Sequence, residues 1–493
     1  MRRLLMAIGV VLVLLAVSAA ALLWFVRGDG VRLALEQQAS AWLGQQVRIS
    51  SARAQLLPRL GVHLADVRIG QAGEVALASV DLATGLWPLL SRRIEDAELV
   101  LSDSRLTMPL PFRIFSGDGS TAGAITDFEV VSIRRIRLDN VRIVSRGREL
   151  DVSIDSSLAG PRVELTEITA AASNTSVRGS GSITLQPAAD VQLELDADRV
   201  DVDDLLALTQ AFTPAGPDGA RGTTQVPGRL TARVTATEVT AAGLRLPQFV
   251  TTVRVQGGRI SLSPTRFMLF GGRYEGDLDV SLVRETSMTL AARVRDVDVA
   301  QLAAFGGVPD TITGRLTGSG TFSGSGPDLR SVLASASGEG TATISTGTIR
   351  NLNLVRTVVL FFGRPAPNTA SATDAFERID LRFTLANHVL NAEAMSTRSR
   401  DSDVVGSATL ALSTKQLSGR ADLSLSEELS AQAGTDLSRY TREGNRIVLP
   451  ATIRGTLGAP QLSIDAGAAI ERGLRNEVER RLKGLLEQFG TSR

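Results

Sequence analysis

The feature that most constrains the fold of this chain is a recurring alternation of apolar and polar residues. Because successive side chains of a β-strand point to opposite faces, each alternating segment predicts a strand with one apolar and one polar face. This is typical of an antiparallel sheet that is wetted on one side. The apolar positions of these segments are Val191, Leu193, Leu195, Leu278, Val280, Leu282, Leu290, Val294, Ile379, Leu381, Phe383 and Leu385.

Glycines separate the alternating segments. The 46 glycines include the pairs Gly257-Gly258, Gly271-Gly272 and Gly306-Gly307, and also Gly276, all of which we interpret as turn signals between strands. The run from Gly318 to Gly326 alternates glycine with serine and threonine over much of its length. It lacks the lysine of a phosphate-binding loop, so we predict a flexible turn there.

The apolar face of so many strands must be covered in some way. A lipid-facing barrel is disfavoured because such barrels carry aromatic girdles, whereas aromatic residues make up 4% of this chain. A sandwich of two sheets and an open, curled sheet both remain. We favour the latter, a mainly β fold with a long curled antiparallel sheet whose open hydrophobic groove is lined by the apolar positions named above, together with a few short helices.

The N-terminus carries one segment of membrane-spanning length. Residues 4–26 hold no charge, and these 23 residues span roughly 35 Å as a helix. Arg2 and Arg3 precede the segment, which favours a cytoplasmic N-terminus. The alternative is a cleaved signal peptide with its processing site at residues 19–21. The anchor is represented by Leu4, Leu12, Leu15, Leu22 and Trp24.

Short helices are predicted beside the strands. Residues 31–43 form an amphipathic stripe that either lies on a membrane or caps the first strands. Two related segments, residues 200–206 and 297–303, each place an aspartate at the expected N-cap, Asp201 and Asp298, with Asp204 and Gln301 three residues later. Their spacing of 97 residues hints at a repeated unit. For the cluster of Asp201, Asp203 and Asp204 we prefer capping to a calcium site, since no glycine-centred ligand loop is present.

Two further helices are predicted towards the C-terminus. Residues 352–362 are apolar and end at Gly363. The last segment, residues 466–493, is an amphipathic helix with a polar face of mixed charge. We favour packing of its stripe against the end of the sheet, and docking on a membrane is the alternative. The stripe consists of Ile470, Leu474, Val478, Leu482, Leu485, Leu486 and Phe489.

The residues that most often carry chemistry are scarce. The chain has no cysteine, and its two histidines, His63 and His388, do not have metal-ligand spacing. A net charge of +1 provides no electrostatic footprint for nucleic acid. We therefore expect no enzyme activity, no cofactor, no bound metal and no nucleic-acid partner.

Several segments together resemble the AsmA-like family. They are residues 55–62 and 64–70 after the predicted anchor, residues 314–333, 338–344 and 347–354 further on, and residues 447–457 and 460–465 near the C-terminus. The motifs are degenerate strand and turn patterns, and their order carries the resemblance. It extends from the anchor to the last helix.

The resemblance implies a protein of the Gram-negative inner membrane with a periplasmic body and no catalytic residues. Larger members are similar to bridge-like proteins whose repeating β-groove carries phospholipids towards the outer membrane. On this basis we divide the chain into an anchor (1–27), an N-terminal AsmA-like groove segment (28–205), a middle groove segment (206–305), a C-terminal AsmA-like segment (306–465) and the last helix (466–493).

Two functions remain open at the level of the sequence. The first is the handling or transfer of glycerophospholipid between the inner and outer membranes, in support of outer-membrane homeostasis. Its partners would be phospholipid acyl chains and the inner membrane, with the outer membrane or envelope proteins as further partners. The second is a structural or assembly factor for outer-membrane proteins that acts through an exposed strand edge, by addition of a β-strand.

Overall fold

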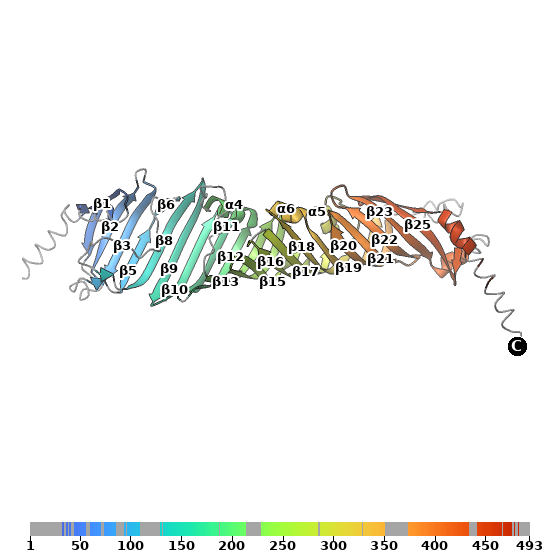
Figure 1. Ribbon diagram of the computed structural model, residues 1–493, viewed down its shortest axis with the longest axis horizontal. Coiled ribbons are helices and arrows are strands. Elements are labelled where there is room, and N and C mark those ends of the chain that lie inside the picture. Colours follow the sequence, from blue (N-terminus) through green and yellow to red (C-terminus); the bar gives the residue numbers. More distant parts are fainter. Residues whose placement is uncertain are drawn as a thin grey trace, which may run out of the picture. The chain divides into compact units, whose positions relative to one another are not determined.

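The computed structural model describes most of the chain between residues 44 and 475 (Figure 1). The predicted anchor at residues 4–26 and the predicted helix at residues 352–362 lie outside the described residues. Within the part of the chain that is described, no helix is long and apolar enough to cross a membrane. The described residues are 32–33, 36–37, 39–40, 44–55, 60–70, 73–84, 93–94, 96–108, 129–130, 132–186, 188–212, 228–283, 286–327, 329–350, 373–432, 441–465, 467–475, 478 and 482.

The prediction of a mainly β fold with a few short helices is confirmed. Contacts divide the chain into two units, Met1–Gly257 and Gly258–Arg493. In each unit most strands pair with the strand that follows in the sequence, so the sheet grows in chain order (Figure 1). The predicted boundaries between groove segments remain predictions.

The first unit contains both antiparallel and parallel pairs. Strands β8 to β12 are antiparallel neighbours, as predicted, but β5 and β6 both pair with β8 in parallel, and β12 pairs with β13 in parallel. A parallel pair needs a connection that returns the chain to the same end of the sheet. Between β12 and β13 that connection is helix α4 (Val202–Phe212) with residues 213–227. The strands are β1 (Val47–Gln55), β2 (Leu60–Ile69), β3 (Val75–Thr84), β4 (Arg93–Ile94), β5 (Ala97–Ser102), β6 (Arg105–Met108), β7 (Glu129–Val130), β8 (Ile133–Ser145), β9 (Arg148–Ala159), β10 (Arg162–Ala172), β11 (Thr175–Thr184), β12 (Ala189–Asp201), β13 (Gly228–Ala241) and β14 (Leu244–Gln256).

The second unit is antiparallel throughout its described pairs. Its helices are α5 (Val299–Phe305), α6 (Leu329–Ala334) and α8 (Glu427–Gln432). Its strands are β15 (Arg259–Leu269), β16 (Gly272–Ser281), β17 (Thr286–Asp298), β18 (Arg315–Gly326), β19 (Ser337–Arg350), β20 (Thr373–Ala386), β21 (Val389–Arg398), β22 (Ser402–Ala411), β23 (Gln416–Leu425), β24 (Arg442–Glu443), β25 (Arg446–Thr456) and β26 (Ala459–Ile464).

Helices α4 and α5 begin in the same way, as their related sequences predict. The Asp298 carboxylate accepts hydrogen bonds from the backbone N–H of Ala300 (2.9 Å) and of Gln301 (3.2 Å), and the Asp201 carboxylate accepts one from Asp204 (3.0 Å). The helices nevertheless join different kinds of strand pair. Helix α4 connects parallel strands, whereas β17 and β18 on either side of α5 are antiparallel. The shared motif therefore specifies the helix start and leaves the topology to the connection that follows.

Each unit has a closed hydrophobic core at one end of its sheet. In the first unit Val47, Ile49, Val67, Ile69 and Val75 are buried across β1, β2 and β3. In the second unit the core joins β22, β23, β25 and β26, and Leu423, Ile447 and Leu449 are fully buried there. Leu429 of α8 packs against this core, and the Ser430 hydroxyl of the same helix accepts a hydrogen bond from Ile447 N–H at 3.0 Å.

The described positions of the predicted helix at residues 31–43 contact the first strand. Glu36 accepts a hydrogen bond from Ile49 N–H (2.7 Å) and another from Arg32 (2.8 Å), and the Ser40 hydroxyl accepts one from Val47 N–H (2.9 Å). Ala39 packs on the core of the first unit. These contacts satisfy backbone donors along β1, which favours the capping interpretation over the membrane one.

The C-terminal helix corrects the favoured prediction. Residues 467–475, 478 and 482 are helical, but the apolar stripe does not pack on the sheet, since Ile470, Leu474, Val478 and Leu482 are 65%, 60%, 56% and 53% exposed. The side that is buried carries the small residues Ala469 and Gly473 instead.

The difference between the closed core and the alternating face yields a prediction about stability. Leu423→Ala should cost about 2–5 kcal/mol of unfolding free energy, because Leu423 is fully buried and its removal leaves a cavity. Leu290→Ala should cost clearly less, since Leu290 is only half-buried and the site adjoins solvent. Urea denaturation of the two variants measures the difference, and equal losses would show that both positions lie in closed cores.

Candidate functional site

The predicted groove positions of the second unit meet on one face of its sheet. Strand register places Leu278 beside Leu290, Leu290 beside Phe322, Phe322 beside Gly338 and Gly338 beside Leu385. These residues form a row that crosses β16 to β20. A second row lies four residues along the strands, on the same face because side chains alternate. Its members are Tyr274, Val294, Gly318, Ala342 and Leu381.

The row between these two consists of four small residues and one aromatic residue. They are Gly276, Ala292, Gly320, Gly340 and Phe383. The prediction that Gly276 and the run from Gly318 to Gly326 are turns was wrong, because they lie inside β16 and β18. These glycines hold strand positions whose side chains would point to the apolar face.

Aromatic rings occupy the space that the glycines leave. A Cβ atom at Gly338 would come within 2.6 Å of the Phe322 ring, one at Gly340 within 2.7 Å of the Phe383 ring, and one at Gly320 within 3.0 Å of Phe322. The Phe322 and Phe383 rings stack with their centroids 6.4 Å apart. The rings therefore lie against the glycine backbone on this face.

Tyr274 and Phe267 extend the aromatic part of this face. Their rings stack with centroids 4.2 Å apart and an interplanar angle of 9°. Burial, and to a smaller extent the neighbouring Asp277 carboxylate, raise the pKa of Tyr274 above its ordinary value. The phenol is consequently neutral at physiological pH and adds no charge to the face.

The apolar face of the second unit is only partly shielded from solvent. Leu278, Val280, Leu290 and Val294 are half-buried, and Leu282, which follows β16, is 40% exposed. On β20, Leu381, Phe383 and Leu385 are half-buried, and Ile379 is buried. Helix α6 covers the end of β18, where its Val332 is fully buried.

The predicted positions of the first unit have the same arrangement. Val191, Leu193 and Leu195 lie on one face of β12 and are half-buried. Leu193 and Leu195 stand beside Gly181 and Gly179 of β11, where an added Cβ would come within 2.7 Å of each leucine. A large side chain beside a cross-strand glycine is thus common to both units.

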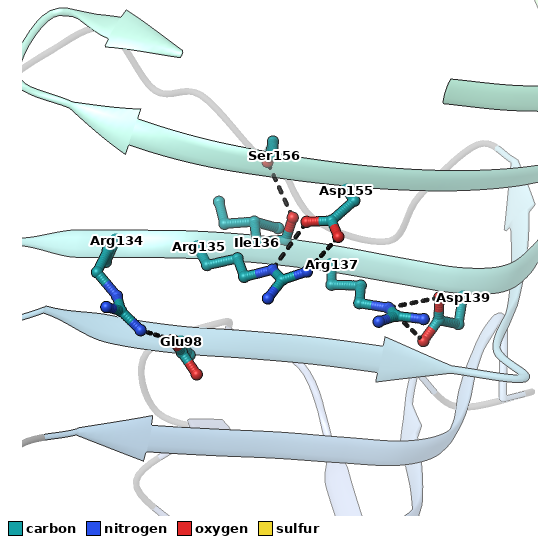
Figure 2. Close-up of polar contacts among 8 residues, drawn as sticks. All are labelled: Glu98, Arg134, Arg135, Ile136, Arg137, Asp139, Asp155 and Ser156. Atoms are coloured by element: carbon teal, nitrogen blue, oxygen red, sulfur yellow. Dashed lines mark hydrogen bonds and ion pairs between the residues drawn. The ribbon is translucent and has the colours of Figure 1, made fainter. Parts of the chain in front are cut away.

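The opposite face carries arginines and carboxylates that pair across strands or along one strand. Figure 2 shows both kinds on β8, where the Arg135 Nε donates to Asp155 of β9 at 2.8 Å and Arg137 pairs at 2.9 Å with Asp139 of its own strand. The hydrogen bonds from Arg135 hold the pKa of the Asp155 carboxyl below its ordinary value. Arg134 likewise pairs with Glu98. This face is a solvated surface of paired charges.

The polar face of the second unit contains a hollow. It measures about 650 Å³, and its lining includes Glu275, Arg293, Glu339, Arg382 and Glu393. Elsewhere, the Nδ1 atom of His63 on β2 lies 2.6 Å from the Oδ1 atom of Asp81 on the neighbouring strand β3. Among the described residues no group of three or more histidine, aspartate or glutamate side chains could hold a metal ion. Asp203 accepts a hydrogen bond from Ala242 N–H at 3.1 Å, and Asp204 pairs with Arg148, so both aspartates make contacts within the fold.

The sequence prediction missed several members of the apolar face. Phe322, Tyr274 and the inward glycines complete rows whose leucines and valines were found. A signal was present in β18, where Leu316, Gly318, Gly320, Phe322 and Gly324 alternate with serine and threonine. Treating glycine as an apolar position in the alternation would have identified this strand.

A comparison with known families identifies the central part of the chain. Residues 218–395 match the AsmA family model. The AsmA-like resemblance seen in the sequence is confirmed by this match, which includes β13 to β20 and most of β21, and therefore all three rows of the second unit. No curated protein and no solved structure matches the chain significantly.

The contact between glycine and aromatic ring in this AsmA segment can be tested by crowding it. Gly320→Val should destabilise the second unit by about 1–3 kcal/mol, because the new side chain crowds both the Glu339 carbonyl oxygen and the Phe322 ring. Combining Gly320→Val with Phe322→Leu should recover part of the loss, which urea denaturation of the single and double variants would measure.

A matched control for this test lies on the neighbouring strand. Ala291→Val adds the same branched side chain on the exposed polar face of β17, where no ring must move, and should be nearly neutral. If the losses of unfolding free energy from Gly320→Val and Phe322→Leu simply add in the double variant, the contact between the Phe322 ring and Gly320 is not supported.

Proposed function

We propose that this protein handles or transfers glycerophospholipid between the inner and outer membranes and thereby supports outer-membrane homeostasis. The observation that carries the proposal is the set of adjoining apolar rows on β16 to β20, whose side chains are half-buried rather than enclosed. In this proposal the face is an open hydrophobic groove along which acyl chains lie.

The chemistry of the rows suits an acyl chain. The rows run across the strands, so a chain that follows one of them passes from strand to strand and meets aliphatic groups, aromatic rings and glycine. The charged side chains lie on the other face, where a phospholipid headgroup could not reach them through the sheet. Without deep enclosure or inward polar groups, such a face favours lipid chains as a class over one particular small molecule.

The degree of burial supports an open face over a closed core. In a closed core the large apolar side chains are fully buried, as Leu423 and Leu449 are at the end of this unit. Leu278, Leu290 and Val294 retain exposure although they belong to the same sheet. Covering such positions with acyl chains would remove apolar surface from water at about 25 cal/mol per Å².

The cellular setting of the proposal comes from the N-terminus and the family. Arg2 and Arg3 before an uncharged segment of spanning length support a single-pass inner-membrane protein with a cytoplasmic N-terminus and a periplasmic body. The AsmA match supports the same setting. We propose no catalytic step, no cofactor and no nucleic-acid partner, and the outer membrane and envelope proteins are further candidate partners.

The groove proposal predicts the effect of a single charge. Val280→Asp should leave the protein folded, since the carboxylate can reach solvent from a half-buried position, but should abolish co-purified phospholipid because a charge among acyl chains is costly. Thin-layer chromatography or native mass spectrometry of the purified protein measures the lipid. Asp279→Arg, its neighbour on the polar face, is the control and should retain lipid.

Photo-crosslinkers at Leu278 and Leu290 provide the second readout. They should capture phospholipid in membranes that contain the full chain. If they capture only protein and Val280→Asp unfolds the body, these strands form a closed core or a protein-binding surface, and the assembly-factor alternative gains instead.

The topology of the proposal is tested separately. A reporter fused after Arg493 should be active in the periplasm, and N-terminal sequencing of the mature protein should recover residues 1–26 attached. A soluble protein that begins near Ala21 or Leu22 would show that the segment is a cleaved signal peptide.

A further inference from the structure

The C-terminal helix is attached to the second unit through its small and basic side. Arg472 makes two hydrogen bonds to the Asp422 carboxylate of β23, both of 2.9 Å, and lies 3.9 Å from Glu443. Ala469 and Gly473 are buried beside it, one turn apart. The Asp465 side chain accepts a hydrogen bond from Ala468 N–H at 3.0 Å and so caps the start of the helix. These contacts determine which side of the helix faces the sheet.

The opposite side of the helix carries the large apolar residues. At about 3.6 residues per turn, Leu474, Val478 and Leu482 lie about 100° or more around the helix from Ala469 and Gly473, and Ile470 lies at the near edge of the stripe. Each of these apolar residues is more than half exposed, with exposed fractions from 53% to 65%. Contiguous exposed apolar side chains of this kind mark a site of interaction with a protein or a membrane.

Three further apolar residues, Leu485, Leu486 and Phe489, follow in the sequence and fall in the same sector if the helix continues, so they would widen the stripe.

The width and charge of the stripe indicate what it contacts. Ile470 to Leu482 advance by about 40° at each step of four residues, so the sector is about 120° wide, broader than the narrow seam of a coiled coil. Exposed charges beside it are balanced, as in the Arg475–Glu471 pair at 3.5 Å, which leaves apolar area as the driving force. A broad sector with charged side chains at its margins is typical of a helix that lies in a bilayer interface.

We propose that this helix docks in the plane of a phospholipid bilayer, with Ile470, Leu474, Val478 and Leu482 between the headgroups and acyl chains. The docking goes beyond lipid handling, because it depends on the helix and not on the apolar rows. It would provide the body with a membrane contact of its own, next to the closed core of β22 to β26, in addition to the predicted N-terminal anchor.

The test uses the full chain in phosphatidylcholine nanodiscs, so that the predicted N-terminal segment already lies in lipid. Protein-free vesicles of phosphatidylcholine and phosphatidylethanolamine are added, and flotation measures how much nanodisc binds to them. Leu474→Asp combined with Leu482→Asp should weaken binding about tenfold or more, because two charges replace buried apolar groups. Gln461→Asp, an exposed substitution on β26, should bind like the unaltered chain.

Thermal unfolding separates docking from structural damage. Because both leucines are more than half exposed, the double variant should unfold at the same temperature as the unaltered chain. If its unfolding temperature falls, the stripe packs on protein and the inference is overturned. Unchanged flotation of a folded double variant overturns it equally.

A fluorescent label provides a second readout. Because the chain has no cysteine, a single cysteine can be introduced and labelled without first replacing any native one. Val478→Cys labelled with an environment-sensitive fluorophore should shift to the blue when vesicles are added, whereas labelled Ser319→Cys on the exposed polar face should not. A probe at residue 478 that does not respond to vesicles, or that crosslinks to a second copy or another segment of the chain, contradicts docking. Lipid capture at Leu290 is measured in the same samples, so failure of docking and failure of lipid handling are distinguishable.

Discussion

The cross-strand register of the second unit is the constraint on which the other features depend. It brings Leu278, Leu290 and Leu385, which are far apart in the sequence, into one row with Phe322 between them. The glycines of the adjoining row then accept the Phe322 and Phe383 rings against the backbone. Since a slip of one residue would move each of these side chains to the other face, register and apolar surface are specified together.

Burial distinguishes regions of the sheet that have the same alternating pattern. Where α8 and β22 to β26 come together, leucines and isoleucine are fully buried, and where no such cover is described the apolar side chains remain half-buried. A closed core stabilises the fold, whereas a partly covered face retains apolar area that a ligand can bury. The proposal of lipid handling rests on this contrast, and the AsmA match over residues 218–395 covers the strands where the face is open.

Much of the fold could be predicted because strand periodicity and helix capping are local. The alternation located β12, β16, β17 and β20, and Asp201 and Asp298 mark helix starts that the structure confirms. Two errors arose because glycine was given only one role, that of a turn residue. Glycine was interpreted as a turn residue in β16 and β18, although there it occupies strand positions where an added Cβ would crowd a neighbouring aromatic ring.

The sequence by itself determined which residues share a face of a strand or a helix, because that follows from the period of each element. It could not determine what each face contacts. The stripe of Ile470 and Leu474 was correctly identified, yet only the tertiary structure shows that Ala469, Arg472 and Gly473 contact the sheet, because the Arg472–Asp422 pair joins segments 50 residues apart. Likewise the parallel pairing of β12 with β13 depends on a crossover path, which no local pattern encodes.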